Sequence, residues 1–292
     1  MKKTLFTGAC TALVTPFLNG AVNFPMLQQL IRRQCDAGIE AIVICGTTGE
    51  SPTLSDTEKL ELFRKAKEYA MGDAKIIAGT GSNSTEHALA LSLAAEECGA
   101  DGLLLVSPYY NKATAQGLYE HYAIIASHTT LPCILYNVPS RTGVDIPVSV
   151  YKKLSQIENI AGVKEASSDI TKITRIRSQC PDDFCIWSGN DDQTVPVMAL
   201  GGKGIISVLS NVLPVQTQAM AKAALDGDFD TASALQIQLL PVIDALFCEV
   251  NPIPVKAAMA LLGYDCGICR RPLTAMEPES LKKLEKALRP FC

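Results

Sequence analysis

The sequence has little charge of either sign and no run of basic residues. Charged residues make up 19% of the 292 positions, and 26 Lys and Arg against 30 Asp and Glu give a formal net charge of −4. No group of cations is larger than pairs such as Arg32–Arg33. Nucleic-acid-binding proteins carry a basic patch or stripe. We therefore expect no nucleic-acid partner.

A continuous membrane-spanning segment is also missing. Residues 123–140 and 204–221 contain no Lys, Arg, Asp or Glu, but Ser, Thr, Asn and Pro interrupt both and Gln also interrupts the second, which is typical of buried core segments. The first residues, Met1–Phe6, imitate a signal peptide, but Gly8 and the Thr and Pro residues that follow break the apolar region. We interpret Met1–Phe6 as a first strand and expect no membrane partner.

Cysteine is frequent, but the sequence lacks a disulfide pattern. The eleven cysteines are an odd number and are scattered singly from Cys10 to Cys292, in a chain too long to need disulfide staples. This predicts reduced thiols and a cytoplasmic location. Cys266 and Cys269 form the one C-x-x-C pair, without a second pair or a nearby histidine, so a zinc or redox role is the weaker interpretation.

Short apolar, β-branched runs recur along the chain and predict eight strands. They are Cys10–Val14, Ala41–Cys45, Lys75–Gly79, Gly102–Val106, Cys133–Tyr136, Ile160–Val163, Phe184–Trp187 and Gly204–Val208. Segments with helical period separate them, one of which begins with a capping box at Ser55 and Glu58. Eight alternating units favour an α/β fold of the (β/α)8 TIM-barrel type. The alternative is a doubly wound open sheet, which lacks its usual G-x-G-x-x-G or P-loop here.

After the last predicted strand, four segments read as helices without a further strand: Pro214–Leu225, Phe229–Phe247, Ile253–Leu262 and Pro278–Leu288. The first can close the barrel and the others form a C-terminal helical appendage. We therefore divide the chain into a barrel over residues 1–226 and a C-terminal helical region over residues 227–292.

One lysine lies at the carboxyl end of a predicted strand, where barrel enzymes place their active sites. Lys164 follows the apolar run 160–163. Burial disfavours an ammonium ion and so favours the neutral, nucleophilic amine that imine chemistry requires. The alternative is a structural lysine paired with Glu165 or a nearby aspartate.

Hydroxyl groups at neighbouring strand ends support the imine interpretation. Forming a carbinolamine, losing water and making an enamine all need proton transfers, and Thr48, Tyr110 and Tyr136 could form a relay for them. Each tyrosine taken alone is equally consistent with a packed aromatic. The turn Thr47-Thr48-Gly49 could offer hydroxyl and N–H groups to a small carboxylate.

Four segments together resemble the signature blocks of the 4-hydroxy-tetrahydrodipicolinate synthase (dihydrodipicolinate synthase) family, within the pyruvate-dependent class I aldolases. They are Cys45–Ser51 (CGTTGES), Tyr136–Gly143 (YNVPSRTG), Gly162–Ala166 (GVKEA) and Ser188–Asp191 (SGND). The resemblance extends from about Phe6 to Leu288 and keeps the order of the blocks.

This resemblance implies roles for individual residues. Lys164 would form the imine with pyruvate and Tyr136 would donate and accept its protons. Thr48 would bridge Tyr136 to Tyr110, which in this family comes from the neighbouring subunit. Thr47, Thr48 and Gly189 would bind the pyruvate carboxylate, and the carbonyl of Ile206 would orient the lysine. The resemblance further implies a homo-oligomer, commonly a homotetramer built as a dimer of dimers, without a metal or redox cofactor.

The second substrate depends on Arg141. In the synthases an arginine at this position holds the carboxylate of L-aspartate 4-semialdehyde, whereas N-acetylneuraminate lyases and keto-deoxy sugar acid aldolases of similar fold usually lack it. The resemblance thus implies condensation of pyruvate with this aldehyde in lysine and diaminopimelate biosynthesis. The sugar acid lyases are the first alternative, and a non-catalytic binding barrel is the more distant one.

Feedback inhibition is where the resemblance is weakest. In lysine-sensitive members the effector lies at the tight-dimer interface, and Ser51, Asn83 and Tyr109 match positions used there. Asp56 and Lys59 stand where sensitive members have neutral side chains, and His87 replaces a glutamate that captures the effector's ammonium group. Loss of that carboxylate and gain of Lys59 predict weak or absent inhibition by L-lysine.

Overall fold

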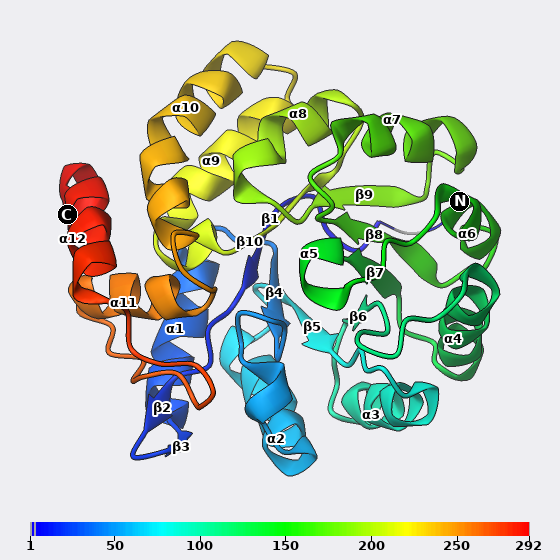
Figure 1. The fold of residues 1–292 in the computed structure, drawn as a ribbon, viewed down its shortest axis with the longest axis horizontal. Helices are drawn as coiled ribbons and strands as arrows, with labels where there is room; N and C mark the ends of the chain where they lie inside the picture. Colours follow the sequence, from blue (N-terminus) through cyan, green and yellow to red (C-terminus); the bar gives the residue numbers. More distant parts are fainter. Residues whose placement is uncertain (1, 3, 292) are drawn as a thin grey trace.

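The centre of the structure is a closed barrel of eight parallel strands in the order β1-β10-β9-β8-β7-β6-β5-β4 (Figure 1). The structure is a computed structural model that describes residue 2 and residues 4–291. The barrel strands are β1 (Gly8–Ala12), β4 (Ala41–Ile44), β5 (Lys75–Gly79), β6 (Gly102–Val106), β7 (Cys133–Asn137), β8 (Ile160–Glu165), β9 (Cys185–Ser188) and β10 (Gly204–Ser207). All eight predicted strands are present, so the predicted TIM barrel is confirmed and the open-sheet alternative is wrong.

Helices surround the barrel, as expected when every strand is buried on both faces. They are α1 (Phe24–Asp36), α2 (Asp56–Ala70), α3 (Thr85–Glu97), α4 (Ala115–His128), α6 (Val148–Leu154), α7 (Ile170–Gln179), α8 (Thr194–Ala199) and α9 (Pro214–Leu225). The predicted capping box is confirmed: the Ser55 hydroxyl accepts from the Glu58 N–H, and the Glu58 carboxylate accepts from the Ser55 N–H.

Short elements lie at the carboxyl ends of the strands, where they shape the mouth of the barrel. They are the antiparallel hairpin β2 (Phe17–Leu18) and β3 (Ala21–Val22), the one-turn helix α5 (Pro139–Thr142), and the 3-10 turns η1 (Ser51–Thr53), η2 (Asp191–Gln193) and η3 (Leu209–Asn211).

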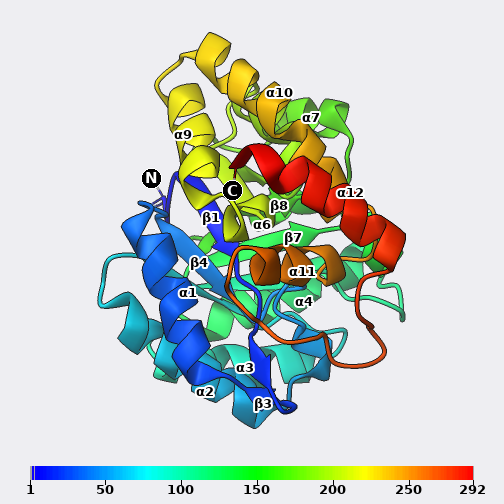
Figure 2. The same cartoon turned by 90° about the vertical axis from the view of Figure 1, so that its left-hand side faces the viewer.

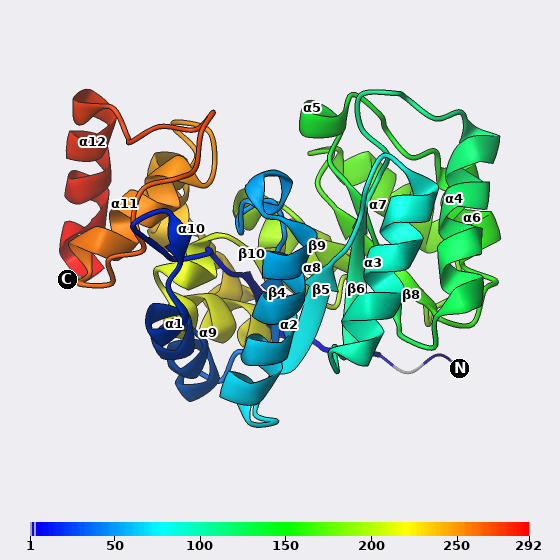
Figure 3. The same ribbon diagram turned by 90° about the horizontal axis from the view of Figure 1, so that it is seen from below.

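The C-terminal helices gather on one side of the barrel, beside α1 and α9 (Figures 2 and 3). They are α10 (Phe229–Leu246), α11 (Ile253–Leu261) and α12 (Pro278–Leu288), followed by the 3-10 turn η4 (Arg289–Phe291). The predicted division after residue 226 would fall in the turn between α9 and α10. None of the helices described here combines the length and the hydrophobicity that a membrane span requires.

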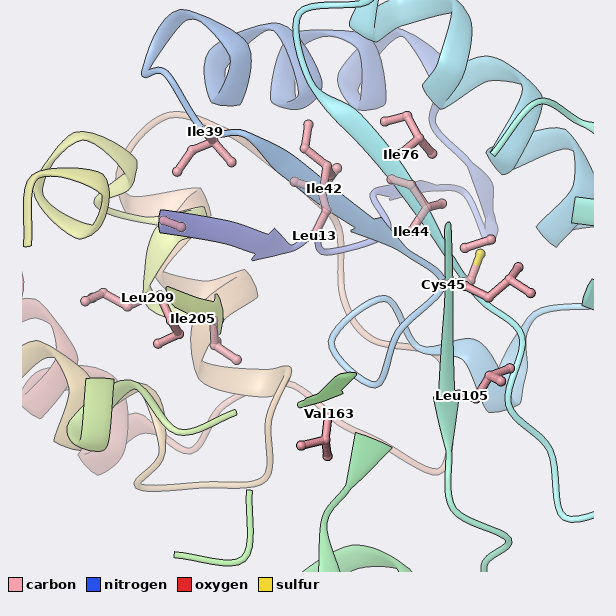
Figure 4. Close-up of a cluster of buried hydrophobic side chains, with 14 of the residues drawn as sticks. Leu13, Ile39, Ile42, Ile44, Cys45, Ile76, Leu105, Val163, Ile205 and Leu209 are labelled. Atoms are coloured by element: carbon pink, nitrogen blue, oxygen red, sulfur yellow. The ribbon is translucent and has the colours of Figure 1, made fainter. Parts of the chain in front are cut away.

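Apolar side chains form two layers that follow the alternation of each strand. Outward-facing residues such as Ile42, Ile76 and Val163 pack against the helices in one large core (Figure 4). Inward-facing residues such as Val43, Ile134 and Ile206 fill the inside of the barrel. Because successive strand residues face opposite layers, each strand presents every second side chain to the inside of the barrel.

The beginning of the chain differs from the prediction. The first strand starts at Gly8, whose N–H donates to the Lys203 carbonyl at 2.9 Å. Among residues 4–7, the Phe6 ring instead stacks on the Trp187 ring inside the barrel, with centroids 4.8 Å apart. The interpretation of Met1–Phe6 as a strand is therefore wrong for the described residues, whereas Met1 and Lys3 lie outside them.

Candidate active site

Lys164 and Tyr136 lie side by side on adjacent strands at the mouth of the barrel. Strand β8 continues past the predicted end to Glu165, and the pairing of β7 with β8 sets Tyr136 opposite Lys164. The Lys164 Nζ lies 4.4 Å from the centre of the Tyr136 ring, and both residues are almost fully buried. Among the described residues, no carboxylate lies within ion-pair distance of the Lys164 amine, so the alternative of a lysine paired with Glu165 is wrong.

Gly189 leaves the space that the lysine side chain occupies. A Cβ atom at this position would lie 2.6 Å from the Ala166 Cβ and 3.2 Å from the Lys164 Cε. A larger residue would therefore clash with Ala166 and also crowd the lysine side chain. On the next strand, β10, Ile206 is fully buried and faces the inside of the barrel.

A buried carboxylate holds the end of β10. Asp191 accepts hydrogen bonds from the Ser207 hydroxyl at 2.5 Å and from the Val208 and Leu209 N–H groups. Burial raises the pKa of Asp191, while these donors and the nearby Lys164 charge oppose that rise. The carboxylate thereby fixes the backbone beside Ile206.

The turn after β4 presents two threonines with different surroundings. The Thr48 side chain is buried, and its hydroxyl accepts a hydrogen bond from the Asn251 amide at 3.0 Å. Thr47 instead lines a cavity that it shares with Tyr136. The turn itself is closed by the Glu50 N–H, which donates to the Thr47 carbonyl at 3.1 Å.

This cavity, of about 280 Å³, opens above β4 to β7. The site residues predicted from sequence that line it are Thr47, Ser51, Lys59, His87, Tyr109, Tyr136 and Arg141. Its charged lining residues are Lys59 and Arg141, its other titratable ones are Cys45, His87, Tyr109 and Tyr136, and no Asp or Glu of the described chain lines it. A cavity with cations alone on its wall favours anionic ligands.

Arg141 reaches the cavity from helix α5. One of its terminal nitrogens donates to the Asn251 carbonyl at 3.3 Å, and no carboxylate among the described residues pairs with it. A guanidinium group has five N–H donors. Arg141 therefore keeps donors free for a carboxylate in the cavity.

Tyr110 lies apart from this group. Its side chain is 91% exposed, and its backbone adopts a positive φ of 70°. The neighbouring Tyr109 lines the cavity of its own barrel. The fold of one chain therefore does not bring Tyr110 to Tyr136.

Asp56 joins two of the cavity-lining residues in a small ion-pair cluster. The Asp56 carboxylate contacts the Lys59 Nζ at 3.2 Å and the His87 Nε2 at 2.9 Å. These partners, His87 first, hold the pKa of Asp56 below its usual value. Asn83 is not on the cavity wall, and its carbonyl accepts from the Asn111 amide.

Sequence reasoning missed the part of the site that the C-terminal region supplies. Asn251 precedes α11 and contacts both Thr48 and Arg141. From α11, the buried Lys256 forms a 2.7 Å ion pair with the buried Glu50. The sequence gives one indication of this contact, because Lys256 is the lone charge in an apolar helical segment. Nothing in the sequence indicates its partner.

The C-x-x-C pair lies in the loop after α11. Burial raises the pKa of Cys266 to about 12 and that of Cys269 to about 11, which makes both poor nucleophiles near neutral pH. In the part of the chain that the structure describes, no group of three or more His, Cys, Asp or Glu residues is arranged to hold a metal ion.

Fold and site together define a (β/α)8 barrel that buries a lysine amine beside a tyrosine at its mouth. A sequence model of the dihydrodipicolinate synthetase family matches residues 5–290. The chain is 47% identical to the 4-hydroxy-tetrahydrodipicolinate synthase of Acetivibrio thermocellus, over 100% of this chain and 99% of that protein. It is 50% identical to the synthase of Lachnoclostridium phytofermentans, with 96% of each chain covered.

Solved structures agree. The crystal structure of dihydrodipicolinate synthase from Aquifex aeolicus superposes with a TM-score of 0.96 at 45% identity, over 98% of each chain. The chain belongs to the dihydrodipicolinate synthetase family.

Proposed function

We infer that the protein condenses pyruvate with L-aspartate 4-semialdehyde to give 4-hydroxy-tetrahydrodipicolinate, in lysine and diaminopimelate biosynthesis. The observation that carries this proposal is a buried lysine amine that pairs with no carboxylate of the described residues. It lies beside a tyrosine on the wall of a cavity whose charged lining residues, Lys59 and Arg141, are both cations. Both substrates carry a carboxylate, and the first step needs an uncharged amine.

Lys164 attacks the keto carbon of pyruvate and forms a carbinolamine, which loses water to become an imine. Removal of a proton from the methyl carbon gives an enamine, which adds to the aldehyde carbon of the second substrate. The amine of that substrate then displaces Lys164 and closes the ring. Tyr136 donates and accepts protons in these steps, since its ring lies directly beside the amine.

The hydroxyl that bridges the two tyrosines is assigned to Thr47 in place of Thr48. Thr47 lines the cavity together with Tyr136, whereas the Thr48 hydroxyl faces the Asn251 amide. A threonine hydroxyl that accepts one hydrogen bond still has its own proton to donate. Thr48 can therefore still donate to the pyruvate carboxylate, and the Ile206 carbonyl orients the lysine. The Gly189 N–H already donates to the Glu165 carbonyl at 2.8 Å, so we do not assign that carboxylate to Gly189.

The main competing function is cleavage of a sialic acid or a keto-deoxy sugar acid. Arg141 argues against it, because a free guanidinium on the cavity wall fits the second carboxylate of a semialdehyde. Turnover of pyruvate with L-aspartate 4-semialdehyde, compared with pyruvate release from the sugar acids in a lactate-dehydrogenase-coupled assay, tests the assignment. Faster cleavage of a sugar acid than condensation would reverse it.

The active site is shared between subunits of a homo-oligomer, with the dimer of dimers as its form. This proposal is supported by Tyr110, an exposed aromatic ring at the mouth of the barrel that lies away from its own Tyr136. The same proposal places the enzyme in the cytoplasm, where the ten described cysteines would remain the free thiols that they are here.

Mixing two weakly active variants is expected to restore activity if Tyr110 serves the neighbouring barrel. In a dimer of Tyr110→Phe and Lys164→Ala chains, one site carries both defects and the other carries neither. Random subunit exchange should therefore bring activity toward about a quarter of the wild-type value. The measurement is the condensation rate after exchange, confirmed by mass spectrometry of the mixed dimers.

The matched control pairs Lys164→Ala with Arg141→Ala, because both residues belong to one barrel and mixing should restore nothing. Mixed dimers without recovery in the Tyr110 experiment would place this tyrosine in its own subunit's site.

L-Lysine at millimolar concentration is expected to inhibit little. A lysine ligand brings two ammonium groups, each of which needs an acceptor when buried. The Asp56 carboxylate is already bound by Lys59 and His87, and the cavity wall adds only cations. A lost charge pair weakens binding by about 30-fold or more.

Inhibition curves for the wild type and for His87→Glu measure this directly. The variant restores a carboxylate and should gain sensitivity. Half-inhibition of the wild type below about a millimolar, or equal curves for both proteins, would show that another group accepts the ammonium.

A further inference from the structure

The two strands that carry Tyr136 and Lys164 also carry a second pair, which faces away from the cavity. The register of β7 and β8 sets Asn137 opposite Glu165, one position after the first pair. Successive strand residues face opposite sides of a sheet, so this second pair lies between the barrel and the helices. Both side chains are almost fully buried.

The Asn137 amide uses all of its hydrogen-bonding groups. Its nitrogen donates to the Glu165 Oε1 and to the Asp145 Oδ1, each at 2.8 Å. Its oxygen accepts from the Ile146 N–H at 3.0 Å. The amide thus joins both ends of the segment 137–146 and fastens them to β8, and this segment contains α5 and Arg141.

Glu165 is a fixed anchor for that amide. Its Oε1 also accepts from the Ser167 N–H at 2.9 Å, and its Oε2 accepts from the Tyr151 hydroxyl at 3.0 Å and faces the Lys172 Nζ at 3.7 Å. A buried carboxylate that is fully hydrogen-bonded and paired is costly to move. Lys172 also pairs with Asp145, so helix α7 holds the far end of the same segment.

Arg141 has no comparable anchor of its own. Its side chain has one hydrogen bond within the described chain, the 3.3 Å contact with the Asn251 carbonyl. Its position relative to Lys164 therefore depends on the segment that carries it, and the Asn137 amide closes that segment onto the lysine's own strand.

We propose that Asn137 is a positioning residue that sets the distance between Arg141 and Lys164, and thereby the fit of the second substrate. This inference rests on the proposed function, in which Lys164 binds pyruvate and Arg141 binds the carboxylate of the aldehyde. Asn137 touches neither substrate. Its loss should weaken binding and reaction of the aldehyde and leave imine formation with pyruvate intact.

The test compares Asn137→Ala with the wild type in two assays. The KM for L-aspartate 4-semialdehyde should rise by about 10-fold, whereas the rate of borohydride trapping with pyruvate should stay within about 2-fold. Asn159→Ala is the matched control. Asn159 directly precedes β8, at the other end of that strand, and its amide donates to three carbonyls of α4 and of the loop before β7. Its replacement also removes buried hydrogen bonds, but none of them involves the Arg141 segment. This control should change neither value by more than about 2-fold.

A double-mutant cycle separates positioning from general damage. If Asn137 acts through Arg141, the Asn137→Ala change should lower kcat/KM by less than about 2-fold when Arg141 is already alanine. An effect of equal size in both backgrounds would overturn the proposal. An unchanged KM for the aldehyde in Asn137→Ala would do so as well.

Asp145→Ala provides a second test if Asn137→Ala does not fold, because the Asp145 side chain is 57% exposed. It removes one bond of the Asn137 amide and should raise the KM for the aldehyde by about 3-fold, again only when Arg141 is present. If the wild type neither catalysed the condensation nor was trapped by borohydride with pyruvate, the proposed function would be refuted. A wild type that condenses normally, beside variants with an unchanged KM for the aldehyde, would refute the role of Asn137 alone.

Discussion

Replacement of Lys164 by methionine is expected to abolish condensation, lowering kcat by more than about 1000-fold, while the protein stays folded. Covalent catalysis depends on the nucleophile, and no other lysine of the described chain lies on a barrel strand beside Tyr136. Methionine has a similar length and suits the buried, apolar surroundings of this side chain. Stability should be retained, because the lysine amine is buried and has no ion-pair partner among the described residues that the substitution would break.

The measurement is the condensation rate, with thermal unfolding as the control for folding. A Lys164→Met variant that unfolds at the wild-type temperature and still retains more than a tenth of the activity would exclude the imine mechanism. A variant that is inactive because it is unfolded should be recognised by its melting curve, and Lys164→Arg then repeats the test with a polar side chain of similar length.

The Arg141→Ala variant should lose about 2–4 kcal/mol of transition-state stabilisation for condensation, about 30- to 1000-fold in kcat/KM. Without the guanidinium, the carboxylate of the aldehyde substrate has no bidentate partner on the cavity wall. The rate of borohydride trapping with pyruvate should be unchanged, because Arg141 cannot act as a base near neutral pH.

Arg141→Lys is the matched variant for this prediction. It retains the charge and loses the planar pair of donors, so it should fall between the wild type and Arg141→Ala. Normal turnover of L-aspartate 4-semialdehyde by Arg141→Ala would show that another group binds this substrate, and the choice between synthase and sugar acid lyase would reopen.

Local sequence signals predicted the barrel well because each strand is a short apolar run between helices. Strands β5 and β6 begin and end at their predicted residues, as do α9 and α12. The errors have two causes. Some polar residues continue a strand past its apolar run, and some apolar residues lie outside the sheet. Strand β8 includes Lys164 and Glu165, which pair with β7, whereas Phe6 packs against Trp187 without joining the sheet.

Only the parts of the site that lie within short sequence motifs could be predicted from the sequence. The motifs that contain Thr47, Tyr136 and Arg141 identified residues that line one cavity. The contacts of Asn251 with Thr48 and of Lys256 with Glu50 join residues about 200 positions apart, and the two positions carry no shared local signal. Tyr110 is a further example, because the fold of one chain leaves its ring exposed and a catalytic role for it would require a second subunit.

Reduction with borohydride in the presence of pyruvate, followed by peptide mapping, tests the central claim most directly. The imine mechanism predicts one three-carbon adduct per chain, on the peptide that contains Lys164. If no adduct formed, the result would favour the alternative of a non-catalytic binding barrel. An adduct on Lys112 or Lys203, with Lys164 unmodified, would contradict the assignment of the nucleophile.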